Sequence, residues 1–312
     1  MSFSTVTLFE WSSLLFFLLS LPVYILFIIT LLKYRKTDTR LASPFFSIAL
    51  SLSLADLGQQ ICSWLFLRVR LWGVFNDWYR WLDRFKFNRF AFFSSFLFFN
   101  AQSSGLLLLT LNRFTAVLWP LTGAIYWSEE RIRKCLVAQW LYTVIVNLPC
   151  FLLVDVQYVR QENSTRVKGF YDSATKLYAA IYYVFYGLQS TLLSILLFLL
   201  YTVMFYHLVK HRKKIAPAIY NEAHSMRRTG AATKSPNGLS TEVRLAVASF
   251  VFCCQYLCTT VLLVLLVVSM DLSKYFLFYS ITLDLLSMSN PFVFLVSSDA
   301  VRENFLTLVK CT

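Results

Sequence analysis

Three ionisable side chains lie within or beside long apolar stretches, where a charge needs partners. Asp56 lies in the run LSLADLGQQ, and Asp284 lies in a second apolar run near the end of the chain. Arg113 directly follows residues 90–112, which contain no ionisable side chain. A charged group at the centre of a bilayer costs about 3 kcal/mol or more, so it usually pairs with another group or faces a polar interior. The chemistry open to these residues is therefore ligand contact, proton exchange or hydrogen bonding between helices.

Asp56 is expected to form a hydrogen-bond network with polar residues of its own helix and of the last apolar segment. Polar side chains stand three and four positions away from it, on the same face of a helix. They are Ser53, Gln59 and Gln60. Asn290, in the run SMSNPFVF, is the expected partner from another helix, and Pro291 leaves a carbonyl one turn earlier free for the same network. The pattern leaves open whether this network only fixes helix packing or changes between two states.

The composition indicates a chain that lipid solvates. Hydrophobic residues make up 58% of the 312 residues and charged residues only 14%, whereas soluble domains carry about 25% charged residues. The basic residues behind the net charge of +13 flank apolar runs and form no separate positive stripe. We therefore expect a lipid bilayer as the partner of these residues, and no nucleic acid.

No residue pattern indicates an enzyme, a metal site or a cofactor. The three histidines stand in no catalytic motif, and the seven cysteines are scattered without zinc-ligand spacing. We interpret most cysteines as small packing residues in helices. Residues 1–13 contain no Lys or Arg, so we expect the first apolar stretch to be a retained span and not a cleaved signal.

Seven apolar segments are long enough to cross a bilayer as helices, because about twenty residues span its hydrocarbon core. They cover approximately residues 10–32, 44–67, 90–112, 135–154, 177–208, 245–268 and 276–297. The sequence therefore predicts an all-α membrane protein, with a single seven-helix domain (1–312) whose termini lie on opposite sides.

Basic residues in the connections predict which side faces the cytoplasm. Segments 33–43, 113–134, 209–244 and the C-terminal tail carry eighteen Lys and Arg, and the connections on the other side carry eleven. Because cytoplasmic loops are enriched in Lys and Arg, we expect the N-terminus outside and the C-terminus inside, in the plasma membrane. The sequon NST falls in a connection expected outside, which makes Asn163 a candidate glycosylation site.

Three hydrophilic segments have features of their own. Aromatic residues in 68–89 recur three or four positions apart, which predicts a helix lying in the membrane interface. Segment 209–244 is basic and ends in a stretch rich in Gly, Ser, Pro and Asn, so we expect a mobile cytoplasmic loop. Residues 298–312 predict either a short amphipathic helix on the inner leaflet or a frayed tail, with Cys311 a candidate palmitoylation site.

Three motifs give the chain a resemblance to a known family. LNRFTAVLWPL, the segment STEVRLAVASFVF that opens the sixth span and NPFVFLVSSDAVRENF that closes the seventh are similar to those of nematode serpentine chemoreceptors, in the gamma and V group. Asp56, Trp140 and the pair Asn290–Pro291 also resemble positions of rhodopsin-type receptors. The resemblance covers essentially the whole chain. It implies a G-protein-coupled receptor for a small external chemical.

The resemblance also implies roles for individual residues. Arg113 matches the arginine that engages the C-terminal helix of a G protein, whereas by itself it would be interpreted as a snorkelling residue at the cytoplasmic boundary. We expect a coupling surface for a heterotrimeric G protein, made of Asn112, Arg113, Arg131, Arg133, Lys134, Lys210, Arg212, Lys213 and Lys214. We expect the small-molecule ligand between the outer halves of the helices, with candidate contacts Ser95, Gln102, Tyr182, Tyr186 and Asp284.

Several positions depart from the rhodopsin-type pattern. Asn112 replaces the acid before the arginine, and Phe294 replaces a tyrosine in the seventh span. Segment 155–176 contains no cysteine, so the usual disulfide to the third helix cannot form. Two alternatives stay open: a seven-helix ligand-gated ion channel, which predicts the opposite orientation, and a proton-coupled transporter. Asp56 and Asp284 suit proton coupling, but the two halves of the chain show no repeat.

Overall fold

The computed structural model describes residues 3–69, 75–119, 126–160, 167–171, 173–229, 237–269 and 272–311. Seven helices in this part of the chain are long and apolar enough to cross a membrane. They are α1 (Phe3–Tyr34), α2 (Pro44–Cys62), α5 (Phe87–Leu118), α7 (Glu129–Leu153), α8 (Ser173–Thr229), α9 (Asn237–Ser269) and α10 (Leu272–Ser297). The seven-helix bundle predicted from the sequence is confirmed.

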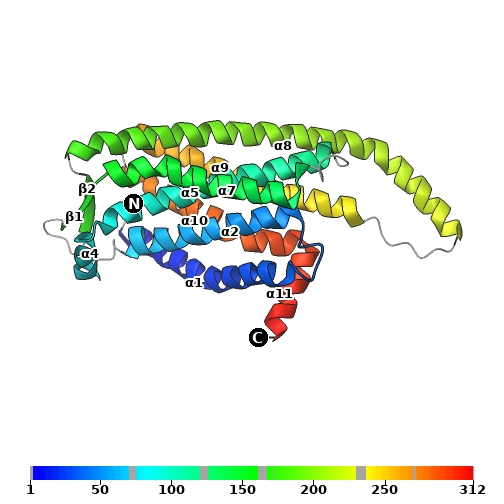
Figure 1. Cartoon of the computed structure of the whole chain (residues 1–312), viewed down its shortest axis with the longest axis horizontal. Helices are drawn as coiled ribbons and strands as arrows, with labels where there is room; N and C mark the ends of the chain where they lie inside the picture. Colours follow the sequence, from blue (N-terminus) through cyan, green and yellow to red (C-terminus); the bar gives the residue numbers. More distant parts are fainter. Residues whose placement is uncertain are drawn as a thin grey trace.

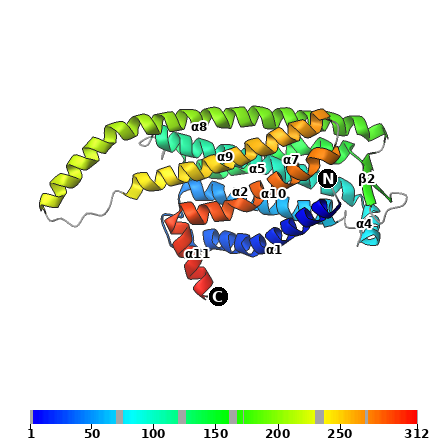
Figure 2. The ribbon, with the colours of Figure 1, turned by 180° about the vertical axis from the view of Figure 1, so that it is seen from behind.

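The seven helices run side by side and define two opposite ends of the molecule (Figure 1). At the hairpin end lie α4 (Asn76–Asp83), the first residues of α1, and the strands β1 (Val156–Arg160) and β2 (Val167–Tyr171). At the α11 end, α11 (Asp299–Cys311) leaves the bundle at an angle, and α8 extends well beyond the other helices (Figure 2). The described chain therefore begins at one end of the bundle and finishes at the other.

α2 lies at the centre of the bundle, whereas α7 and α8 lie at its rim. In the most apolar stretch of α2, 72% of the residues are buried, against 22% in α7 and in α8. Side chains such as Leu192 of α8 and Ile145 of α7 point outward, where lipid can solvate them. Polar side chains on α2 must instead find partners on neighbouring helices, because the membrane interior offers no water.

α2 continues without a break into a π-helical segment, Ser63–Arg68. A π-helix has more residues per turn than an α-helix, so it changes the direction in which the following side chains point, and such segments are frequent at functional sites. Arg68 is the last residue of this segment, and it lies within ion-pair distance of Asp284 on α10. The apolar pattern of the second span, which runs continuously over 44–67, gives no sign of this irregularity.

The connection between α7 and α8 forms an antiparallel hairpin, which a purely α-helical fold does not include. β1 and β2 pair from Val156 opposite Tyr171 to Arg160 opposite Val167. Both strands contain valine and aromatic residues, which favour an extended backbone. The membrane-spanning bundle itself is helical, as predicted. Asn163 lies between the two strands, outside the described residues.

The connection between α8 and α9 is largely helical, in contrast to the loop expected over 209–244. α8 continues to Thr229, and α9 begins at Asn237. The segment beyond the span contains Ala, Lys, Arg and Glu, which are strong helix formers, so α8 can continue past the apolar stretch without lipid around it. Residues 230–236 lie outside the described part of the chain.

α11 is a short amphipathic helix, which is the first of the two alternatives expected at the end of the chain. Val301 and Leu308 are buried, and Phe305 is half-buried against the main core. Asp299 in its first turn accepts hydrogen bonds from Arg244 at 2.5 Å and from Arg302 at 2.6 Å. The Arg244 guanidinium lowers the pKa of the Asp299 carboxyl, so this acid stays charged and holds the start of α11 to α9.

α4 presents most of its aromatic side chains outward. Four of them, within the helix or flanking it, are about half exposed or more: Phe75, Trp78, Trp81 and Phe85. Tyr79 is the exception, because it is buried and donates its hydroxyl to the Leu65 carbonyl. This arrangement suits a helix that lies at the depth of the lipid headgroups, where Trp and Tyr are enriched.

Candidate functional site

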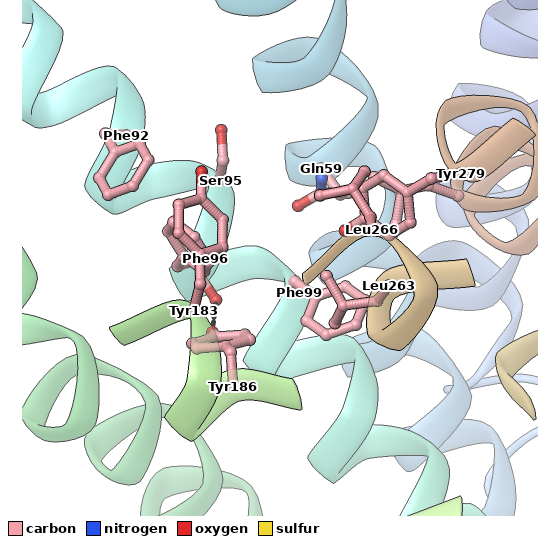
Figure 3. Close-up of a pocket in the computed structure, with 11 residues that line it drawn as sticks. Gln59, Phe92, Ser95, Phe96, Phe99, Tyr183, Tyr186, Leu263, Leu266 and Tyr279 are labelled. Atoms are coloured by element: carbon pink, nitrogen blue, oxygen red, sulfur yellow. Dashed lines mark hydrogen bonds between the residues drawn. The ribbon is translucent and has the colours of Figure 1, made fainter. Parts of the chain in front are cut away.

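A cavity lies between α2, α5, α8, α9 and α10 in the half of the bundle nearest the hairpin (Figure 3). Its volume is about 130 Å³. It is lined by Gln59, Phe92, Ser95, Phe96, Phe99, Tyr183, Tyr186, Leu263, Leu266, Tyr279 and Leu283. The described part of this lining is mostly aromatic and contains no carboxylate, ammonium or guanidinium group. An engineered cavity of about 150 Å³ in another protein, lined by Leu, Ile and Phe, binds benzene, so this one has room for a molecule of about that size.

Two of the five predicted ligand contacts line this cavity. Ser95 lies on α5, and its hydroxyl donates to the Ala91 carbonyl at 3.0 Å. Tyr186 lies on α8, and its hydroxyl donates to the Phe96 carbonyl. Because each hydroxyl has already donated its proton, each can offer a ligand only a hydrogen-bond acceptor.

The other three predicted contacts lie outside the cavity lining and are held by partners within the protein. The Tyr182 hydroxyl donates to Asn147 Oδ1. Gln102 donates to Asp56 at 2.6 Å, and Asp284 forms an ion pair with Arg68 at 2.6 Å. The structure therefore separates the five predicted residues into two that face the cavity and three that belong to polar contacts between helices.

Gln59 is a polar cavity residue that the sequence analysis assigns elsewhere. Its position three residues after Asp56 makes it an expected partner of that acid. In the structure its side chain faces the cavity and lies near Tyr279 and Leu266 (Figure 3). The only signal for this in the sequence is an uncharged polar residue in the second half of an apolar span.

Arg68 and Asp284 form a buried ion pair at the hairpin end. Their side chains are 12% and 6% exposed, and the Arg68 guanidinium lies 4.7 Å from the centre of the Trp64 ring. Ser13 on α1 accepts from Arg68 at 2.6 Å and donates to Asp284 at 2.7 Å. Arg68 also donates to the Ser280 carbonyl at 3.2 Å. The cluster thus ties α1 and α10 to the end of α2.

Asp56 is the centre of a second buried polar cluster, in the middle of the bundle. It accepts hydrogen bonds from the Tyr24 hydroxyl at 2.7 Å and from Gln102 at 2.6 Å. Asn290 also donates to it, so the structure brings Asp56 together with the partner expected from another helix. Asp56 and Asn290 are 1% and 2% exposed. Four helices, α1, α2, α5 and α10, therefore meet at one carboxylate.

Pro291 contributes to this cluster through the backbone of α10. Because proline has no N–H group, the carbonyl four residues earlier, that of Ser287, loses its helical donor. Gln60 on α2 donates to that carbonyl at 2.8 Å. The Ser287 hydroxyl accepts from Gln102 at 2.8 Å. The free carbonyl expected from the Asn-Pro pair thus holds α2 against α10.

Arg113 turns into the bundle at the α11 end. The residue is 5% exposed, and its guanidinium lies 3.9 Å from the centre of the Phe45 ring on α2. It also donates to Asn112 Oδ1 at 3.1 Å. A snorkelling arginine would extend toward the headgroups. The inward position instead places a permanent charge against an aromatic face, where a cation is attracted by the ring.

The other basic residues expected to form a coupling surface lie around the same end of the molecule. Arg131, Arg133 and Lys134 are exposed in the first turns of α7, where Lys134 pairs with Glu130 at 2.7 Å. Lys210 is exposed on α8 and lies 5.8 Å from the Tyr206 ring. Arg212, Lys213 and Lys214 follow in the same helix, but their side chains are outside the description. Among the residues that the structure describes, no group of His, Cys, Asp and Glu could hold a metal ion.

These features define a seven-helix membrane protein with an internal cavity near one end and a buried arginine near the other. The chain belongs to the serpentine type 7TM GPCR chemoreceptor Srv family, whose model matches residues 13–311. A curated relative, serpentine receptor class V-1 of Caenorhabditis elegans, is 25% identical over 301 residues, which cover 95% of this chain and 88% of the relative. The resemblance seen in the sequence is confirmed, and the chain is a multi-pass membrane protein of a chemoreceptor family.

Proposed function

We propose that this chain is a chemosensory G-protein-coupled receptor that binds a small external chemical in its cavity and activates a heterotrimeric G protein at the α11 end. The observation that carries the proposal is the arrangement of α5. Ser95 lines the cavity, Gln102 joins the Asp56 cluster, and Arg113 lies buried at the opposite end. At 1.5 Å per residue, this one helix connects the cavity to the arginine over about 27 Å.

Ligand binding would act by shifting an equilibrium between two arrangements of the bundle. In the arrangement described here, Arg113 packs against Phe45 and its charge is turned away from the surface. In the second arrangement the guanidinium would leave the ring and join the exposed basic residues of α7 and α8. The Asp56 cluster lies between the two sites and joins four helices, so it is the element that would change its hydrogen bonds as the helices move.

The orientation of the bundle is part of the proposal. The excess of Lys and Arg near the α11 end supports a cytoplasmic position for that end. The hairpin end would then face outside, together with the sequon at Asn163. Cys311 would lie at the inner leaflet at the end of α11, where a palmitoyl chain could anchor it.

A ligand screen on cells that express the chain tests the proposal as a whole. The screen reads second-messenger concentration and membrane current in parallel. A chemical that changes the second messenger without a current supports the receptor. A current that persists when G proteins are blocked would support the channel alternative, and uptake of the chemical by reconstituted vesicles would support the transporter.

The variant Arg113→Glu tests the role of the buried arginine. It should abolish ligand-evoked second-messenger signalling, because a carboxylate cannot replace the guanidinium donors, and it should leave surface expression within about twofold of wild type. Arg80→Glu, the same charge reversal on exposed α4 at the hairpin end, is the matched control and should signal normally. An Arg113→Glu receptor that signals like the control would contradict the proposed coupling mechanism.

A further inference from the structure

Gln59 differs from the other buried glutamines of the bundle. Gln60, Gln102 and Gln139 each fix their amide by donating to a neighbouring helix. The Gln59 side chain is buried, yet its amide makes no hydrogen bond to any described residue; its Oε1 is buried without a partner, as are the Oε1 atoms of the other three glutamines. A buried polar group without a partner costs about 1–3 kcal/mol. Such a cost is tolerated where a ligand supplies the missing partner.

The surroundings of Gln59 restrict what that ligand can be. The cavity places the amide opposite a wall of aromatic rings, which includes Phe96, Phe99 and Tyr186. Among the described residues, no charged side chain lines it, and Asp284 is matched by Arg68 at 2.6 Å. An ion in this cavity would be desolvated without compensation. The volume of about 130 Å³ limits the ligand to roughly the size of one six-membered ring.

We propose that the cavity selects a small neutral molecule, of about one ring in size, whose hydroxyl or N–H group forms a hydrogen bond with the Gln59 side-chain amide. Gln59 then determines specificity through a directional hydrogen bond. The aromatic rings add apolar contact, which favours binding but does not orient the ligand. This inference rests on the proposed function, because it names the class of chemical that the receptor detects.

Phenol, toluene and benzoate are suitable probes, because they share a ring and differ in the donor and the charge. Binding to the purified full-length chain in lipid nanodiscs is measured by ligand-observed NMR, with empty nanodiscs subtracted. Wild type should bind phenol about fivefold more tightly than toluene, the effect of one neutral hydrogen bond. It should not bind benzoate. Gln59→Leu, which keeps the side-chain size, should lose the preference for phenol and bind toluene as well as wild type does.

Two further variants make the result decisive. Gln189→Leu makes the same chemical change on α8, where Gln189 donates to Asn100 outside the cavity, and it should keep the phenol preference. Leu263→Trp fills the cavity and should remove binding of phenol and toluene alike. The inference is overturned if Gln59→Leu still prefers phenol, if benzoate binds best, or if Leu263→Trp binds the probes normally. Phenol bound through Gln59 without any second-messenger response in cells would instead refute the proposed function and leave this inference standing.

Discussion

Arg68 and Asp284 show how single charged residues are accommodated in this membrane protein. Both side chains are largely buried and form an ion pair at 2.6 Å, and Ser13 forms a hydrogen bond with each of them. Neither charge would be tolerated alone, because removing one partner of a buried pair leaves an uncompensated charge. Substituting only one of the two residues should therefore reduce the stability of the protein strongly.

A double-mutant cycle tests this account of the pair. Arg68→Leu and Asp284→Leu should each destabilise the protein by about 3–5 kcal/mol, and the double variant should recover most of that loss, because two apolar residues often replace a buried pair without cost. Thermal unfolding of the detergent-solubilised chain measures all three. Additive losses in the double variant would show that the two residues act independently.

Residue spacing predicted some of these contacts and not others. The Asp56–Asn290 contact and the free carbonyl before Pro291 could be predicted, because an acid in one span needs a donor from another and proline always removes one N–H group. The Arg68–Asp284 pair could not, because it depends on the turn that the π-helical segment introduces. Gln59 was assigned to Asp56, since sequence spacing gives the face of a helix only approximately.

Among the elements, α11 is held to the bundle by two ion pairs. Asp299 of α11 pairs with Arg244 of α9, and Glu303 of α11 pairs with Arg40. Arg40, in the connection between α1 and α2, contacts both Asp38 and Glu303 at 2.9 Å, and Asn304 donates to Asp38 at 2.8 Å. The Arg40 guanidinium lowers the pKa of Asp38, as Arg244 lowers that of Asp299. Both acids lie outside the membrane-spanning segments and can titrate.

The docking of α11 should therefore weaken in acid. Because the folded pKa values of Asp38 and Asp299 lie below the ordinary value of 3.8, their contribution is complete at neutral pH and is lost as pH falls below about 4. Spin labels at Thr307 and Lys33 should report one short distance at pH 7 and a broader, longer distribution at pH 3. The double variant Asp38→Asn, Asp299→Asn should show the broad distribution at both pH values. Equal distributions for wild type at the two pH values would contradict this role.

The spans could be predicted because a bilayer imposes a minimum apolar length on each of them. The bilayer imposes no such length on the connections between the spans, so their structure is harder to predict. β1 and β2 contain only five residues each, too few for their pattern to stand out beside the apolar runs. The extension of α8 to Thr229 depends on helix propensity outside the membrane, which the loop-like composition of 209–244 obscures.

At the scale of the whole molecule, the proposed function needs the two sites to face opposite sides of the membrane. The hairpin and α11 lie at opposite ends of the bundle (Figure 1). The separation of the two sites follows from α5, because the cavity residue Ser95 is near the start of that helix and Arg113 is near its end. The direction in which the molecule is inserted is inferred from the distribution of Lys and Arg and from the sequon at Asn163. If the direction were reversed, the cavity would face the cytoplasm and Arg113 the outside.

Epitope accessibility on intact cells tests that direction. One tag is placed before Met1 and a second after Thr312, and antibody binding is compared before and after the membrane is permeabilised. The account predicts that the first tag is labelled on intact cells and that the second becomes accessible only after permeabilisation. An amino-terminal tag that is hidden until permeabilisation, together with an accessible carboxyl-terminal tag, would contradict it.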